Sequence, residues 1–162
     1  PEEALLLGGR TALMTDGNVV QFGPTAEIYR QPKDLDAAKV FSNPPINTAE
    51  VSKQGNEVIL NDQTRWTLSG AAAGLSDGIY TLAIRPHHVM PVETAHNTVR
   101  LEGHVQVTEL SGSESSAHFD MDGQSWVSLS PGVHPYFVGE VHTFYLDPNH
   151  CFFFAPSGEL VA

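Results

Sequence analysis

One apolar run, followed by a charged residue and a proline, decides the fold: Ile79-Tyr80-Thr81-Leu82-Ala83-Ile84-Arg85-Pro86-His87-His88. In an extended strand alternate side chains face opposite sides, so both faces of residues 79–84 are largely apolar. A strand with two apolar faces lies in the interior of a sheet and is covered on both sides. Pro86 ends it, because proline donates no ladder hydrogen bond. We therefore expect a central strand here, which Arg85 leaves on the face of Ile79 and Ala83.

Short β-type runs recur on either side of this strand. They cover residues 57–60, 65–68, 101–107, 116–121, 126–129, 140–146 and 151–154. Residues with turn chemistry, such as Asn61-Asp62 and Asp122-Gly123, separate them. Many short strands with regular breaks are typical of a small antiparallel barrel or sandwich. The sequence therefore predicts a mainly β protein.

The first 43 residues have a different texture, with short helices around one hairpin. Thr15-Asp16-Gly17 separates two apolar runs and predicts the hairpin turn. We expect helices at about residues 1–7, 26–31 and 35–41, the second capped by Thr25 and the third by Asp34. The paired prolines Pro44-Pro45 then end the helical part. The predicted division is into residues 1–43 and residues 44–162.

Length, the first residues and cysteine content add further expectations. The chain has 162 residues and one cysteine, Cys151, which excludes an internal disulfide and favours a reducing compartment. No apolar run approaches the ~18 residues of a transmembrane helix. Residues 4–7 are apolar with nothing before them to pack on, and Pro1 is not an initiator residue. We expect the chain to begin inside a larger domain.

The charge is strongly acidic and unevenly distributed. Nineteen acidic and eight basic residues give a net charge of −11. Residues 1–43 contain six acids and four bases, whereas residues 44–162 contain thirteen acids, four bases and all eight histidines. An anionic surface repels phosphate backbones and anionic lipid. Direct binding to nucleic acid or to a membrane surface is therefore not expected, and we expect no direct membrane insertion.

The patterns that mark nucleotide and acyl chemistry are missing. A P-loop needs a lysine directly after glycine, and none of Lys33, Lys39 and Lys53 follows one. Ser113 lies outside any Gly-x-Ser-x-Gly elbow. Two carboxylates in one region, Glu109 and Glu114, could form an acid/base pair, but thirteen acids make chance proximity common. We predict no catalytic residue and no bound cofactor for these 162 residues.

The histidines do not form a recognisable metal pattern. His87 and His88 are adjacent, so on a strand they would point to opposite faces. The other six are scattered over separate predicted strands and loops, and zinc sites usually pair close ligands. We expect surface or edge histidines and no metal site, while a meeting of His134 and Cys151 in space stays open.

Read in order, the motifs resemble one family. Pro1-Glu2-Glu3-Ala4-Leu5 and Gly9-Arg10-Thr11-Ala12-Leu13-Met14 resemble the stretch just after the switch histidine of ABC-transporter ATPase subunits. The run from Asp16 to Pro32 is similar to the family's D-G-x-hydrophobic-x-Q-x-G-x-P-x-E-hydrophobic-Y-x-x-P pattern.

The second part resembles the regulatory domain of the same family. Phe41-Ser42-Asn43-Pro44-Pro45-Ile46-Asn47 is similar to the F-x-G-S-P-x-M-N junction of sugar importers, with departures at Asn43 and Ile46. Ala83-Ile84-Arg85-Pro86-His87-His88 resembles G-I-R-P-E-H, with His87 in place of glutamate. Residues 105–114 resemble a V-E-x-L-G-x-E strand and turn, with Ser111 as an extra residue.

The resemblance to the maltose and glycerol-phosphate importer type implies a fold and an assembly. Residues 1–43 would be the end of a nucleotide-binding domain, with a short α/β tail, and residues 44–162 an OB-like antiparallel barrel. The full-length parent would use ATP and Mg, form a homodimer through the regulatory domain, and work with transmembrane permease subunits. It would be cytoplasmic, at the inner face of the cell membrane.

The matched motifs also supply structural or interface positions. The family-motif residues are Pro45, Asn47, Arg85, Pro86, His88, Glu109, Gly112 and Glu114. We expect Gly112 to permit a turn or bulge, and Arg85 to be partly buried against a carboxylate, with Glu109 or Glu114 as candidates. Arg100, beside a polar run, should lie on the surface.

Three functions remain in view. The favoured one is a regulatory and dimerisation module of an importer ATPase. The second is an oxyanion-binding sensor, since related OB-type domains of molybdate importers bind an anion; amides of residues 111–116 could contribute there. The third is a metal-dependent enzyme that uses the histidines.

Overall fold

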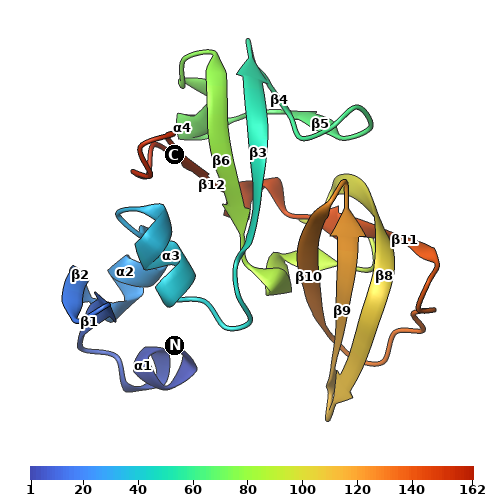
Figure 1. Ribbon diagram of the computed structural model, residues 1–162, viewed down its shortest axis with the longest axis horizontal. Coiled ribbons are helices and arrows are strands. Elements are labelled where there is room, and N and C mark those ends of the chain that lie inside the picture. The colour runs from blue at the N-terminus through green and yellow to red at the C-terminus, as the bar shows by residue number, and fades with distance from the viewer.

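The computed structural model describes residues 1–162, and its first 43 residues form a small unit that we call the N-terminal segment (Figure 1). It contains α1 (Glu2–Leu7), the hairpin β1 (Arg10–Thr15) and β2 (Asn18–Pro24), α2 (Thr25–Arg30) and α3 (Leu35–Val40). The unit has its own small apolar core, formed by Leu13, Ile28, Ala37 and Phe41. The predicted hairpin and all three predicted helices are present.

The two predicted helix caps have different outcomes. Asp34 caps α3, because its carboxylate accepts a hydrogen bond of 2.8 Å from the amide of Ala37. Thr25 does not cap α2. It is already the first helical residue, after Pro24, and its hydroxyl lies within hydrogen-bond distance of the carbonyls of Gly8 and Gly9. The side chain is thus used to hold the loop that follows α1.

The rest of the chain forms two five-stranded antiparallel sheets. In the first, the order β12-β6-β3-β4-β5 brings together Phe152–Phe154, Gly78–Ile84, Asn47–Gln54, Glu57–Ile59 and Arg65–Thr67. In the second, the order β10-β9-β8-β11-β7 brings together Gln124–Pro131, Glu114–Met121, Val99–Ser111, Val141–Leu146 and Val89–Met90. Short helical turns complete the structure: α4 (Gly70–Ala73), η1 (Pro86–His88) and η2 (Pro148–His150).

The second sheet curls into a nearly closed barrel. Its two edge strands approach each other, and the hydroxyl of Ser128 in β10 donates a 2.5 Å hydrogen bond to the carbonyl of Val89 in β7. Closure of this kind protects the edges of a sheet. The expected mainly β fold with an OB-like antiparallel barrel is confirmed.

A single core lies between the two sheets and contains 18 buried residues. Its largest members are aromatic, and the rings of Phe119 and Phe144 stack at 4.1 Å between centroids. Gly103 makes this packing possible, because a Cβ there would lie 2.0 Å from the ring of Phe119. The indole of Trp126 also donates a hydrogen bond of 3.0 Å to the carbonyl of Thr48, which ties the barrel to β3 of the other sheet.

The predicted interior strand at residues 79–84 is confirmed as β6. β6 lies between β12 and β3, and Leu82, Ala83 and Ile84 are buried. Strand β3, which pairs with it, was not predicted. Its buried face includes Asn47 and Lys53 beside the small Ala49, so the strand lacks the apolar alternation that indicates a half-buried strand.

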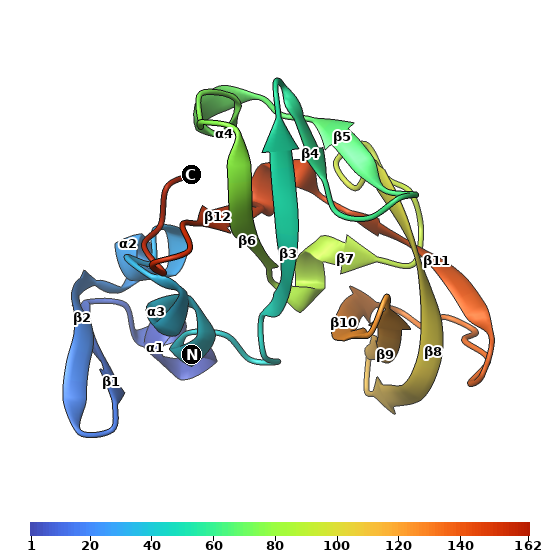
Figure 2. The same ribbon diagram turned by 45° about the horizontal axis from the view of Figure 1, so that its top comes forward.

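The N-terminal segment packs against the first sheet, and both views place α2 and α3 beside β6 and β12 (Figures 1 and 2). The amide of Leu35 donates to the carbonyl of Gly158, and the amide of Leu160 donates to the carbonyl of Lys33. Ala38 also shares an apolar cluster with Ile46, Ala83 and Phe154. The boundary between residues 43 and 44 as a domain division stays a prediction. No helix has the length and apolar character needed to cross a bilayer.

Candidate functional site

Arg85 is the central residue of the junction between the N-terminal segment and the first sheet. It directly follows β6, and only 5% of its surface is exposed. Its Nη2 donates a hydrogen bond of 2.9 Å to the carbonyl of Tyr29 in α2. The guanidinium lies 3.7 Å from the centre of the Tyr29 ring and 5.2 Å from that of Phe152. Arg85 thus connects helix α2 to strands β6 and β12.

The prediction that Arg85 pairs with a carboxylate was wrong. No carboxylate forms an ion pair with it. Glu109 lies in the exposed part of β8, and Glu114 borders one cavity together with Arg85 without pairing with it. The negative faces of two aromatic rings take the place of the carboxylate. Burial lowers the pKa of Arg85 below its ordinary value, while Tyr29 shifts it in the opposite direction.

The other family-motif positions lie at separate places. Asn47 and Pro86 are buried, whereas Pro45 is exposed. Gly112 has a φ of 61° in the turn between β8 and β9, a conformation that favours glycine. Arg100 is exposed and pairs with Glu102 at 2.9 Å, as expected of a surface residue. Whether these positions form an interface stays a prediction.

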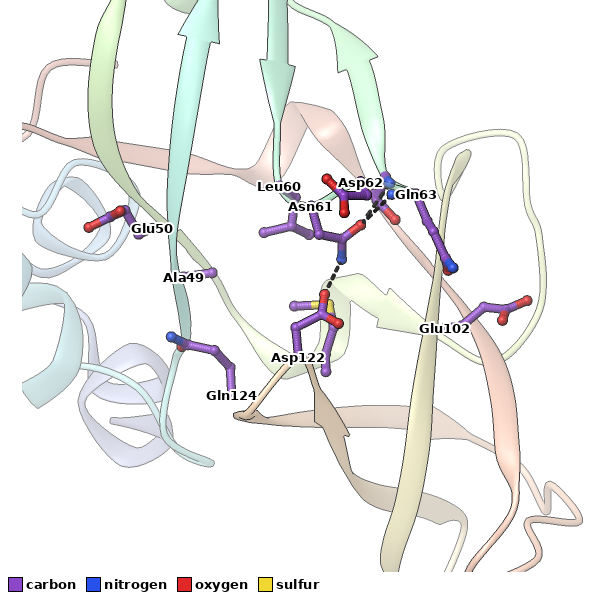
Figure 3. Close-up of a pocket in the computed structure, with 11 residues that line it drawn as sticks. Ala49, Glu50, Leu60, Asn61, Asp62, Gln63, Glu102, Asp122 and Gln124 are labelled. Carbon is purple, nitrogen blue, oxygen red and sulfur yellow. Dashed lines mark hydrogen bonds between the residues drawn. The ribbon is translucent and has the colours of Figure 1, made fainter.

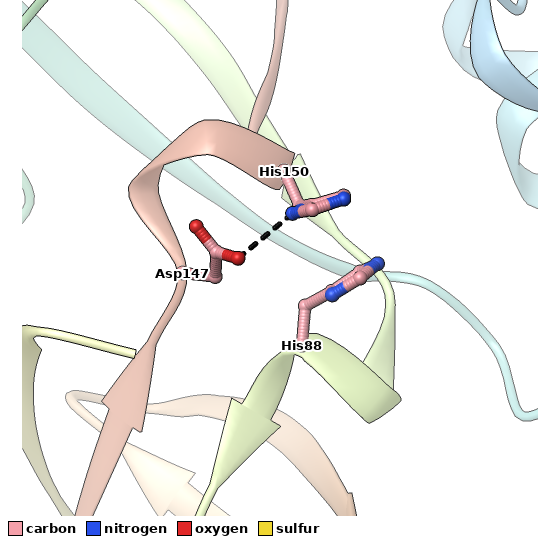
Figure 4. Close-up of side chains that lie close together, drawn as sticks. All are labelled: His88, Asp147 and His150. Atoms are coloured by element: carbon pink, nitrogen blue, oxygen red, sulfur yellow. Dashed lines mark hydrogen bonds and ion pairs between the residues drawn. The ribbon is translucent and has the colours of Figure 1, made fainter. Parts of the chain in front are cut away.

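Three of the eight histidines cluster, contrary to the expectation of scattered side chains. His87 and His88 belong to η1 rather than to a strand, so their rings lie 4.0 Å apart instead of on opposite faces. The ring of His150 from η2 stacks on His88 at 3.7 Å, with 16° between the planes (Figure 4). Its Nδ1 lies 2.8 Å from a carboxylate oxygen of Asp147, which is buried. This cluster has no local sequence signal, because about 60 residues separate its halves.

Electrostatics in the cluster disfavour extra positive charge. Burial, and then the neighbouring His87 and His150, lower the pKa of His88 to about 3, although Asp147 acts in the opposite direction. Burial and Arg85 also lower the pKa of His87. Both imidazoles are therefore neutral at physiological pH. A neutral imidazole has one ring nitrogen free to accept a hydrogen bond or to ligate a metal.

A cavity of about 350 Å³ opens beside this cluster at the junction. Cationic and polar groups of Arg30, Arg85, His88 and His150 line it together with the apolar Tyr29 and Phe152. A meeting of His134 and Cys151 is not seen: Nε2 of His134 lies 2.9 Å from the carbonyl oxygen of Pro131. The thiol of Cys151, in contrast, contacts the carbonyl of Asp147.

A second cavity, of about 400 Å³, lies between the two sheets and is acidic (Figure 3). Its rim combines carboxylates and amides, and the side chain of Asn61 donates a hydrogen bond of 2.6 Å to Asp122 across it. The other polar side chains there include Glu50, Asp62 and Glu102, all of them exposed. Exposed carboxylates are common on an acidic surface, and we assign no ligand to this cavity.

Comparisons with known proteins agree with this architecture. Residues 82–154, which run from the end of β6 to β12, match the TOBE domain family. The maltose/maltodextrin import ATP-binding protein MalK of Photorhabdus laumondii is 32% identical over an alignment of 165 positions, which covers 96% of this chain and 44% of that protein. The sn-glycerol-3-phosphate import ATP-binding protein UgpC of Ruegeria pomeroyi is 31% identical over 121 residues, covering 75% of this chain and 32% of that protein.

The similarity includes proteins whose role is not described. The uncharacterized ABC transporter ATP-binding protein YcjV of Escherichia coli is 24% identical over 98% of this chain and 45% of its own length. The chain spans less than half the length of these relatives. Its similarity nevertheless extends across both the N-terminal segment and the barrel. The chain therefore contains a TOBE domain and corresponds to the C-terminal part of an ABC importer ATP-binding subunit of the MalK and UgpC type.

Proposed function

We propose that this chain is the regulatory and dimerisation module of an ABC importer ATPase subunit. In full length that subunit would couple ATP hydrolysis to the uptake of a sugar-like solute. The observation that carries the proposal is the 32% identity to a MalK protein across 96% of the chain, because it includes both the N-terminal segment and the barrel. The parent subunit would be cytoplasmic and would contact membrane permease subunits.

The junction gives this proposal a physical route for regulation. Arg85 holds α2 through its hydrogen bond to Tyr29 and its stacking on the ring. Backbone hydrogen bonds from Leu35 and Leu160 attach α3 and its preceding turn to the segment after β12. A partner that displaces the first sheet therefore also displaces the helices of the N-terminal segment. Regulation of this kind needs two sites and a differential contact between them.

Exposed apolar side chains on the barrel support association with another protein surface. They lie near the end of β8, in the connection from β10 to β11 and at the start of β11: Leu110, Val133, Phe137, Val138 and Val141. Leu110 and Val133 border one shallow cavity, so at least these two are neighbours. A specific interface typically buries ~800 Å² on each partner, and we propose a second copy of the chain as that partner.

The assembly can be tested by analytical sedimentation. Each copy carries a charge of −11, so two copies repel, and salt screens this repulsion over about 8 Å at physiological ionic strength. We expect association to strengthen as salt is raised from a low concentration. Leu110→Asp should weaken it, whereas Val19→Asp, on the exposed face of the N-terminal hairpin, should leave it unchanged. A tight dimer that dissociates with added salt, or equal effects of the two variants, would contradict the proposed interface.

Nucleotide turnover is assigned to the parent rather than to these residues. No P-loop sequence is present in the chain, so we expect neither binding nor hydrolysis of ATP with Mg by residues 1–162 alone. Calorimetric titration and a phosphate-release assay measure the two properties. Hydrolysis that survives repurification would place catalysis within the chain and would overturn this division of roles.

A further inference from the structure

The His88–Asp147–His150 cluster lies where the chain passes between the two sheets. After β6 of the first sheet, the chain reaches β7 of the second through η1, which contains His88. After β11 of the second sheet it returns to β12 of the first through η2, which follows Asp147 and contains His150. The two crossovers thus meet, and each supplies side chains to the cluster (Figure 4).

The three side chains present ligand atoms of suitable type at short range. One ring nitrogen from each histidine and one carboxylate oxygen of Asp147 all lie within 4.8 Å of one another. Tetrahedral coordination with bonds of about 2.0–2.1 Å needs ligand atoms roughly 3.4 Å apart. The rings of His88 and His150 are stacked almost parallel, so His150, whose side chain is half exposed, has to rotate out of the stack to point a ring nitrogen at the same ion. Metal binding replaces the present hydrogen bond between Nδ1 of His150 and the carboxylate of Asp147, so that both groups can face the ion.

Backbone hydrogen bonds hold the cluster in place. The carbonyl of His88 accepts from the amide of Asp147 at 3.0 Å and from the side chain of Asn97 at 2.9 Å. The second oxygen of Asp147 accepts from the amide of Asn149 at 2.9 Å. Partners of this kind orient metal ligands and are as important as the ligands themselves. The main chains of both crossovers are therefore fixed relative to each other.

We propose that His88, Asp147 and His150 bind one divalent transition-metal ion that links the two crossovers. Two imidazole nitrogens and one carboxylate oxygen suit zinc, nickel or copper better than magnesium or calcium, which prefer oxygen ligands. Three protein ligands leave a coordination position for water, on the side of the cavity that His88 and His150 line. The nearby positive charge of Arg85 opposes a cation, so we expect a dissociation constant on the order of micromolar rather than nanomolar.

Zinc binding to tag-free protein tests the proposal directly, because a histidine tag would itself bind the metal. The full chain is stripped with a chelator, dialysed and titrated with zinc by calorimetry. We expect saturation close to one zinc ion per chain. His150→Gln should weaken binding by about tenfold or more, and Asp147→Asn should do the same. The matched control is His96→Gln, because His96 is exposed on another loop and should leave the affinity unchanged.

Spectroscopy and folding controls complete the test. Cobalt bound in place of zinc should show d–d absorption without a thiolate charge-transfer band, since Cys151 is not among the ligands. Circular dichroism shows whether each variant is folded, and His150→Gln is the informative one because its side chain is half exposed. Absence of zinc binding, equal affinity of folded His150→Gln, or a thiolate band would overturn the proposed ligand set.

Discussion

Asn47 and Val127 join the two sheets by a reciprocal pair of hydrogen bonds. The side-chain nitrogen of Asn47 donates to the carbonyl of Val127 at 2.8 Å, and its side-chain oxygen accepts from the amide of Val127 at 2.7 Å. Val127 belongs to β10, an edge strand of the barrel, and Asn47 begins β3 of the other sheet. One carboxamide thus satisfies both main-chain groups that a neighbouring strand would otherwise pair.

Removal of this carboxamide should destabilise the fold. Asn47→Ala leaves the amide and carbonyl of Val127 without partners in a buried place, which costs about 1–3 kcal/mol. Urea unfolding measures the loss as a lower midpoint with an unchanged slope. Asn18→Ala is the control, because the side chain of Asn18 makes one exposed hydrogen bond of 3.3 Å. Equal midpoints for the two variants would show that the pair does not hold the sheets together.

The role of Arg85 at the junction predicts a specific mutational pattern. Arg85→Ala should lower the urea midpoint more than Arg100→Ala, because Arg85 is buried against Tyr29 while Arg100 forms an exposed ion pair. Exposed pairs contribute only ~0–1 kcal/mol.

Three further variants separate ring stacking from ion pairing at Arg85. Arg85→Lys should have a urea midpoint almost as low as that of Arg85→Ala, because an ammonium group cannot stack flat on the ring. Tyr29→Leu should be destabilising, and Glu114→Ala should not, because no carboxylate pairs with Arg85. A large effect of Glu114→Ala would revive the ion pair that the sequence suggested.

Gly103 should not tolerate a side chain. The Cβ of Gly103→Ala would lie 2.0 Å from Cδ2 and 2.7 Å from Cγ of Phe119, so the stacked pair of Phe119 and Phe144 has to shift. Overpacking of this kind costs about 1–3 kcal/mol. Gly74→Ala is a matched control, since its nearest neighbour would be 3.5 Å away. Thermal unfolding of both variants compares them, and a Gly103→Ala protein as stable as the control would contradict the close packing.

Cys151 should react slowly in the folded protein. Burial, with a smaller contribution from the negative Asp147, raises the pKa of its thiol, and the thiolate is the reactive form. We expect alkylation by iodoacetamide at pH 8 to be slow in buffer and fast in denaturing urea. Mass spectrometry measures both rates. Rapid alkylation of the native chain would show that the sulfur is accessible and ionised.

The sequence was enough to predict those elements that depend on residues close together in the chain. The apolar run 79–84 indicated an interior strand, Asp16-Gly17 indicated a hairpin, and Asp34 indicated a cap, and all three are present. Strand β3 was missed because its buried face includes the polar Asn47 and Lys53. Asn47, for example, is satisfied by Val127, 80 residues away.

The candidate sites show the same limit. Arg85 was predicted to be partly buried and is in fact buried, but its partners are the ring and the carbonyl of Tyr29 rather than an acid. Charge pairing can be guessed from composition, whereas stacking on a particular ring depends on how two segments meet. The histidine cluster was missed for two reasons: Pro86 starts a helical turn, so His87 and His88 do not alternate as on a strand, and His150 comes from a distant crossover.

The two crossovers also govern the order in which this protein can fold during synthesis. The first sheet contains β3, which starts at Asn47, and β12, which ends at Phe154. Strand β12 pairs with β6, which a ribosome releases about 70 residues earlier, and such long-range pairings form slowly. Until β12 emerges, β6 has one open edge and Phe153 and Phe154 are missing from the core. The nascent chain therefore exposes an unpaired strand edge at that stage, which is a template for pairing with another chain.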